Sequence, residues 1–178
     1  GAGGGAVETG GGFVARANLG LEYRLSSDFN MIIDGGYLTA PDGNFDTPYV
    51  GFNLAYVMKT FAQDQKGAPL TKTNFIQTNK WRFRPAHQWY FDAQRKDNSA
   101  RDMHLLGGKI DWFAGDWWYF TGQGLSAYEG GAGGYSEGHW GIGVVSPSWN
   151  NLQVYGEMLI GAGGGGGVDS GSALLYKP

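Results

Sequence analysis

The sequence contains no cysteine, which excludes disulfide bonds and cysteine-ligated metal sites. It has no run of about 18 apolar residues, the length that a transmembrane helix needs. Charged residues make up only 16% of the chain, below the roughly 25–35% typical of a soluble surface. The net charge of −3 provides no electrostatic footprint for nucleic acid. We therefore expect neither a disulfide-stabilised domain, nor a helical membrane protein, nor a nucleic-acid-binding protein.

Glycine and aromatic residues are abundant: there are 33 glycines among 178 residues, and aromatic residues reach 15%. Glycine disfavours helices, and no segment shows a sustained apolar stripe at helical spacing. Apolar and polar side chains instead alternate, which is the pattern of a strand with two different faces. The alternation is clearest in residues 13–25, 29–37 and 50–59. This pattern indicates an all-β chain.

Five further segments are interpreted as strands: residues 81–94, 103–113, 117–128, 139–146 and 152–160. Short turns at Ser26–Asp28, Ala114–Asp116 and Ser146–Asn151 alternate with longer loops at Thr39–Pro48, Arg95–Arg101 and Glu129–Gly138. This arrangement predicts an antiparallel up-and-down β-barrel of about eight strands. Residues 1–178 are expected to form this single barrel domain, with 1–60 and 80–178 joined by a linker at about 61–79.

The two ends of the sequence resemble each other, because Gly1–Gly5 recurs as Gly161–Gly165. Three interpretations stay open: chance similarity of glycine-rich segments, a permuted barrel, or one period of a tandem array. A barrel cut within a strand would leave unpaired backbone groups. We expect closure within one chain, by pairing of Glu8–Leu25 with Leu152–Ile160. The alternative is that Ser172–Pro178 pairs with another copy.

Three pieces of the sequence contain strand and short-turn patterns: Leu19–Phe29, Phe52–Tyr56 and Ala114–Tyr119. In these pieces the chain resembles the small Gram-negative outer-membrane β-barrels. Leu54–Phe61, which ends in an aromatic residue, also resembles the terminal assembly signal of that class. Phe61 departs from it, because this residue is out of register with the preceding apolar residues. The resemblance implies an outer-membrane or cell-surface location, with membrane lipid and the outer-membrane assembly machinery as partners.

Charged side chains also occupy the polar faces of the expected strands. These residues are Arg16, Glu22, Arg24, Asp34, Lys109, Asp111 and Glu157. They fit a polar pore, a catalytic carboxylate pair, or an interior network of ion pairs and hydrogen bonds. We favour the network, because side chains fill the interior of an eight-stranded barrel.

A catalytic site has weaker support. Some eight-stranded barrels modify lipid A with a serine, a histidine and an acid, which makes Ser136, His139 and His104 the candidates. Ser136 and His139 are three residues apart, so a regular strand would place them on opposite faces. Neither a metal-binding motif nor a nucleotide-binding loop is present, and no cofactor is expected.

The direction of the apolar face separates the main alternatives. We expect it to face lipid, and the residues concerned are Leu19, Leu21, Phe52, Leu54, Leu152 and Val154. In an inverted, soluble barrel the same residues would face inward and bind an apolar ligand; aromatic stacking on a glycan is a further alternative. The low content of charged residues favours the barrel whose apolar face contacts lipid. We therefore expect a non-enzymatic outer-membrane protein whose loops contact surface partners or other copies of itself.

Overall fold

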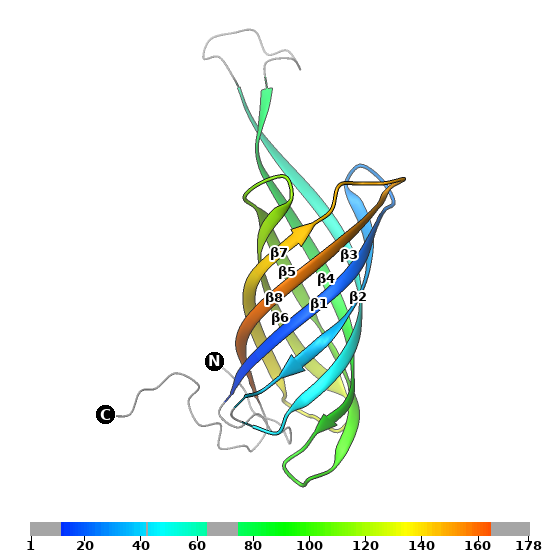
Figure 1. Cartoon of the computed structure of the whole chain (residues 1–178), viewed down its shortest axis with the longest axis vertical. Helices are drawn as coiled ribbons and strands as arrows, with labels where there is room; N and C mark the ends of the chain where they lie inside the picture. Colours follow the sequence, from blue (N-terminus) through cyan, green and yellow to red (C-terminus); the bar gives the residue numbers. More distant parts are fainter. Residues whose placement is uncertain (1–11, 42, 64–74, 165–178) are drawn as a thin grey trace, which may run out of the picture.

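The structure is a computed structural model that describes residues 12–41, 43–63 and 75–164, and it is a closed antiparallel barrel (Figure 1). Its strands are β1 (Phe13–Arg24), β2 (Phe29–Thr39), β3 (Asp46–Gln63), β4 (Phe75–Gln94), β5 (Ala100–Phe113), β6 (Trp118–Glu129), β7 (Ser136–Val145) and β8 (Leu152–Gly164). Each strand pairs with the next one in sequence. The prediction of an all-β, eight-stranded up-and-down barrel is thereby confirmed.

The barrel closes through β1 and β8 of the same chain. Their register runs from Phe13 opposite Ala162 to Tyr23 opposite Leu152. Closure within one chain, which the sequence analysis predicted, is therefore confirmed over this ladder. Gly1–Gly5 and Ser172–Pro178 lie outside the described residues.

The connections divide between two ends of the barrel (Figure 1). We call one the turn end: it carries residues 25–28 between β1 and β2, 114–117 between β5 and β6, and 146–151 between β7 and β8. The other is the loop end, with residues 40–41 and 43–45, 95–99, and 130–135. The described chain begins and finishes at the loop end.

β3 and β4 are the longest strands, with 18 and 20 residues. The linker predicted at about 61–79 is therefore too long, because Phe61–Gln63 belongs to β3 and Phe75–Asn79 belongs to β4. Beyond Thr60 the two strands pair only with each other, after an irregularity in their register. Backbone hydrogen bonds continue where the apolar alternation has ended, so the pattern alone predicted strands that were too short.

The predicted loops were too long for the same reason. Asp46–Pro48 begins β3, Ala100 and Arg101 begin β5, and Ser136–Gly138 begins β7. These residues pair with the neighbouring strand although their side chains show no clear apolar pattern. Short, well-paired connections are the consequence.

The barrel interior is layered. An apolar cluster closes the loop end, and it includes Phe45, Tyr49, Tyr90, Met103 and Tyr135. A second apolar cluster lies toward the turn end: Ile32, Ala55, Phe113, Tyr119, Val145 and Tyr155. Buried charged and polar side chains fill the layer between them. The interior is thus occupied by side chains along its length.

Two inward-facing glycines make room for large rings. A Cβ added to Gly143 would lie 2.3 Å from the Tyr119 ring, and one added to Gly20 would lie 2.4 Å from the Tyr155 ring. A methyl group does not fit at those distances. Part of the high glycine content therefore serves packing inside the barrel.

Candidate functional site

A continuous set of ion pairs crosses the barrel interior. In order of contact, its members are Glu22, Arg82, Asp111, Arg84, Glu157, Lys109 and Asp34. Asp111 joins the two arginines: Arg82 Nε donates to its Oδ2 at 2.6 Å and Arg84 Nη2 to its Oδ1 at 2.7 Å. Lys109 Nζ lies 3.3 Å from Asp34 Oδ2 and 3.5 Å from Glu157 Oε2. Each buried charge thus faces an opposite one, which offsets its loss of hydration.

Two tyrosines and an asparagine extend this network. The Tyr155 hydroxyl donates to Asp34 Oδ2 at 2.7 Å, and the Tyr119 hydroxyl donates to Glu157 Oε1 at 2.9 Å. Asn18 Nδ2 donates to the other Glu157 oxygen at 3.1 Å. These neutral donors satisfy carboxylate lone pairs that the cations leave open.

A second buried cluster surrounds Arg16, nearer the loop end. Its Nε donates to the Tyr49 hydroxyl at 2.8 Å, and its Nη1 donates to Gln88 Oε1 at 2.8 Å. Nη1 also lies 3.5 Å from Glu137 Oε1, and the Tyr135 hydroxyl donates to the second Glu137 oxygen at 2.8 Å. This cluster links β1, β3, β4 and β7 across the barrel.

Six of the seven charged residues expected inside are buried there, and the seventh, Arg24, is exposed near the turn end. Arg82, Arg84 and Glu137 also belong to the interior networks, although they were not among the predicted interior residues. The sequence does indicate an inward position for the two arginines, since they alternate with Trp81, Phe83 and Pro85 along β4. Their partners were not visible, because Glu22 and Glu157 come from distant strands.

The loops at the loop end are held by contacts inside the barrel mouth. Phe45 and Tyr135 are buried, with their ring centroids 5.9 Å apart. Arg95 Nη2 in the β4–β5 loop donates to the Gly130 carbonyl of the next loop at 2.9 Å. Within the β4–β5 loop, Ser99 donates from its backbone N and its Oγ to Asp97, which lowers the pKa of that carboxyl group. These loops therefore present an ordered surface.

The structure separates the catalytic candidates. Ser136 faces outward, with its Oγ 2.9 Å from Ser126 Oγ. His139 is buried inside, where its Nδ1 lies 3.0 Å from Gln123 Nε2. His104 lies on the outer face and stacks on Trp89 at 5.1 Å between ring centroids. The three side chains therefore do not converge on one site.

The outer wall of the barrel is apolar and carries aromatic side chains near both ends. Four strands each carry two outward-facing rings that are eight residues apart: Phe29 and Tyr37, Trp81 and Trp89, His104 and Trp112, and Phe120 and Tyr128. The turn-end belt consists of Phe29, Trp81, Trp112 and Phe120. The loop-end belt consists of Tyr37, Trp89, His104 and Tyr128. Eight residues span about 26 Å along a strand, which is about 20 Å along the axis of a barrel with ordinary strand tilt.

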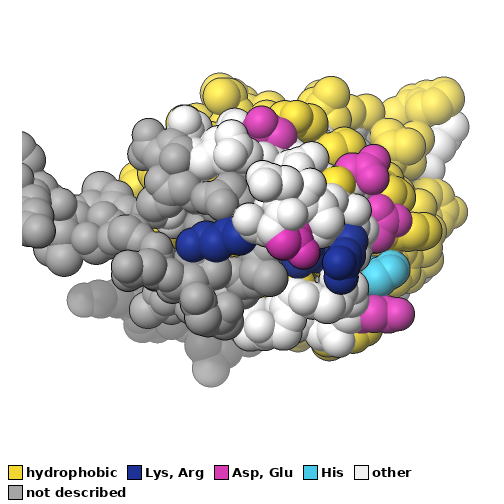
Figure 2. Space-filling view, turned by 90° about the horizontal axis from the view of Figure 1, so that it is seen from below, with side chains coloured by type: hydrophobic (Ala, Val, Ile, Leu, Met, Phe, Trp, Pro, Cys, Tyr) yellow, Lys and Arg dark blue, Asp and Glu magenta, His cyan; other side chains and the backbone are white. Residues whose placement is uncertain are grey.

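Between the belts the described outward-facing positions carry no charged side chain. They carry exposed aliphatic and aromatic residues, among them Leu19, Leu21, Ile33, Phe52, Leu54, Ile110, Ile142, Val154 and Met158. Leu152, also expected on the outer face, is only partly exposed. Seen along the axis from the loop end, hydrophobic side chains form the visible side of the barrel, and charged ones gather on its end (Figure 2).

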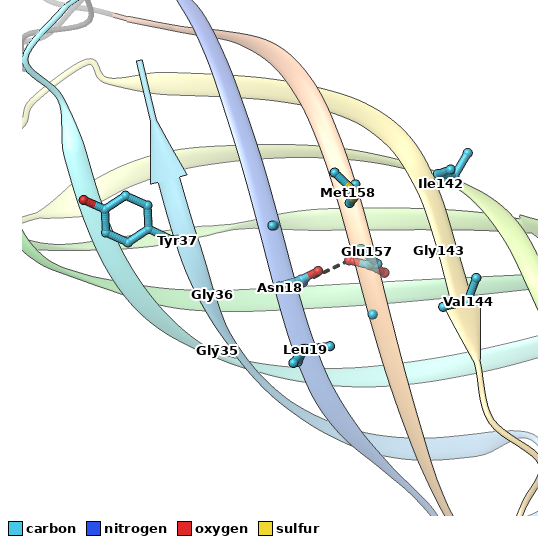
Figure 3. A pocket seen from close by; sticks show the side chains of 12 residues that line it. Asn18, Leu19, Gly35, Gly36, Tyr37, Ile142, Gly143, Val144, Glu157 and Met158 are labelled. Carbon is cyan, nitrogen blue, oxygen red and sulfur yellow. Dashed lines mark hydrogen bonds between the residues drawn. The ribbon is translucent and has the colours of Figure 1, made fainter. Parts of the chain in front are cut away.

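A groove of about 570 Å³ indents this wall across β7, β8, β1 and β2 (Figure 3). Gly35 and Gly156, on the outer face, leave space that neighbouring Leu19 and Met158 border. The polar side chains of Asn18 and Glu157 in this view bond to each other inside the barrel. The outer surface of the groove is therefore apolar, and it suits hydrocarbon rather than a polar substrate.

Comparison of the chain with models of protein families, with curated proteins and with solved structures gives no match. No helix among the described residues has the length and apolar character to cross a membrane. Over the same part of the chain, no group of three or more histidines and carboxylates is placed to hold a metal ion.

Proposed function

We propose that the chain is a non-enzymatic outer-membrane protein, a barrel that spans the bilayer and presents its loop end to surface partners or to neighbouring copies. The observation that carries this proposal is the charge-free outer wall between the two aromatic belts. A bilayer excludes charges from its hydrocarbon layer, and amphipathic rings favour the headgroup level. The separation of the belts is close to the apolar band of about 25 Å that such barrels carry.

The alternative of a soluble barrel with an apolar ligand fits less well. Leu19 and Met158 are each 70% exposed on the outside, and the central interior holds ion pairs rather than an apolar cavity. A water-exposed wall of this kind would favour aggregation. In lipid the same wall is solvated by acyl chains, and the apolar groove offers them a complementary surface.

A lipid A-modifying enzyme is also less well supported, because Ser136 and His139 lie on opposite faces of β7. The ordered contacts that fill the mouth favour a stable platform for recognition over a conduction path. The proposed contact surface is therefore the set of loops that contain the described residues 40–41 and 43–45, 95–99, and 130–135.

Membrane fractionation tests the location. The protein is expected to remain in the outer-membrane fraction after carbonate washing and to need detergent for extraction. A chain that purifies from the aqueous fraction as a stable monomer without detergent would overturn the proposal.

Site-directed labelling tests the orientation, because any introduced cysteine is the only one in the chain. Lys96→Cys at the loop end should react with a membrane-impermeant maleimide in intact cells. Asp116→Cys at the turn end should react only after lysis, and it is the matched control. Labelling of the two in the reverse pattern would contradict loops on the cell surface.

Mass spectrometry of lipid A tests the enzyme alternative. We expect the same acyl pattern in cells with and without the protein. A changed pattern that His139→Ala or His104→Ala abolishes would show that the protein is an enzyme.

A further inference from the structure

Three cationic side chains converge on a pocket in the turn-end mouth of the barrel. Arg24 ends β1, while Lys59 of β3 and Lys80 of β4 lie directly opposite each other in the ladder. Together with Ser27, Asn30, Val57 and Gln153, they line a pocket of about 240 Å³. Arg24, Lys59 and Lys80 each lie two residues from a buried inner-face residue of the same strand, namely Glu22, Val57 and Arg82. The pocket is therefore the outermost part of the barrel interior.

The positive charge in this pocket is not balanced locally. Among the described residues, no acidic side chain forms an ion pair with Arg24, Lys59 or Lys80. The charges of Arg82, Lys59 and Arg24 all act on Lys80, and Glu22 is the carboxylate that opposes them. Glu22 is already bonded to Arg82 and to Asn30 on the inner side of the pocket.

The position of Lys80 is also constrained. Its Nζ lies 3.9 Å from the centroid of the Phe113 ring, and the side chain is only partly exposed. Like charges directly opposite each other destabilise a sheet. A neighbouring hollow lined by Lys59 and Lys80 includes Asp116, but no ion pair joins them. A bound anion would therefore stabilise the like-charged pair of Lys59 and Lys80.

We propose that the pocket lined by Arg24, Lys59 and Lys80 binds a phosphate group. Lysine ammonium groups bind phosphate as point charges, and an arginine can donate two parallel hydrogen bonds to it. The Ser27 hydroxyl provides a further polar group. The pocket is smaller than typical sites for drug-sized ligands, so it suits a compact anion. The phosphate comes either from solution or from a lipid headgroup beside the turn-end belt, and this inference does not require the barrel to span a membrane.

Phosphate titration of the full chain in a maltoside detergent, which itself carries no phosphate, tests the site. Inorganic phosphate is expected to raise the thermal midpoint in a saturable way, since a ligand that binds only the folded state stabilises it. The double variant Lys59→Gln/Lys80→Gln should bind phosphate at least about tenfold more weakly, because two charge-assisted contacts are lost. Lys96→Gln, at the opposite end, is the matched control and should bind as the unmodified chain does.

A second variant guards against a folding defect. Lys59→Glu turns the like-charge pair into an opposite-charge pair, so it should keep or raise the thermal midpoint without phosphate while losing the phosphate response.

Bilayer discs of phosphatidylcholine alone or with phosphatidic acid distinguish the two sources of the phosphate group. Stabilisation by the anionic discs beyond that by free phosphate assigns a headgroup, whereas stabilisation by free phosphate alone assigns a soluble ligand. If neither probe stabilises the chain, or if both act equally on Lys59→Gln/Lys80→Gln, the proposal is wrong.

Discussion

The inner and outer faces of the same strands differ more than any two regions along the sequence. Over the described residues, the inner face of the strands carries nine buried charged side chains, and the outer face between the belts carries none. This is the reverse of the usual arrangement in a water-soluble protein, where charges lie outside. Ion pairs therefore stabilise the charges in the barrel interior, whereas the outer wall presents an apolar surface.

The interior arrangement has a specific physical cost. Removing charges from water is unfavourable, and ion pairs offset this only when each charge has well-placed partners. Asp111, bonded to Arg82 and Arg84, is the clearest such junction. The difference between the two faces can therefore be tested by changing one residue on each.

The largest effect is expected inside the barrel. Asp111→Ala would leave two buried guanidinium groups without their shared carboxylate and should reduce the free energy of unfolding by about 3–5 kcal/mol. Urea titration in detergent, followed by tryptophan fluorescence, measures this loss. Asp97→Ala removes an exposed carboxylate that lies 3.8 Å from Arg101 and accepts hydrogen bonds from Ser99. It is the control, with an expected effect much smaller than that of Asp111→Ala, because its contacts are solvent-exposed. Equal effects of the two variants would show that the interior network does not contribute to stability as described.

An outer-wall substitution separates a lipid environment from water. Ile33→Arg places a charge between the belts on β2, and in a bilayer it should cost roughly 2–4 kcal/mol of folding free energy. Phe29→Arg on the same face of β2, in the turn-end belt, should cost no more than about 1 kcal/mol. Folding titrations into phospholipid vesicles provide the measurement. A tolerated Ile33→Arg would argue against a lipid-facing wall.

The smallest expected effect concerns the fit of rings inside the barrel. Gly143→Ala would push a methyl group into the Tyr119 ring and should destabilise the barrel by roughly 1–3 kcal/mol. Gly124→Ala is a suitable control, because nothing lies within 4 Å of the added Cβ. Thermal unfolding of both variants gives the comparison. If Gly143→Ala is as stable as Gly124→Ala, the tyrosine is not held in place by this contact.

The alternation in β1 and β3 was sufficient to predict the strands and the two unlike faces, because side chains in any strand leave on alternate sides. The same local rule predicted that Ser136 and His139 would point apart, and the structure places them on opposite faces. Alternation carries no information on which face is inside, nor on which distant charges meet. Strand ends were also not predicted, since Phe61–Gln63 and Phe75–Asn79 pair through backbone groups without an apolar pattern.

The class of the fold follows from local features of the sequence, namely the alternation and the turn residues. The pairing of distant side chains depends instead on how the strands assemble into the barrel. Arg82 forms an ion pair with Glu22, and Lys59 lies opposite Lys80, only because barrel closure and strand register bring these residues together. Such contacts join residues far apart in the chain, and a one-residue change in register would turn each side chain to the other face. For this reason the ion-pair network and the proposed phosphate pocket were visible only in the folded barrel.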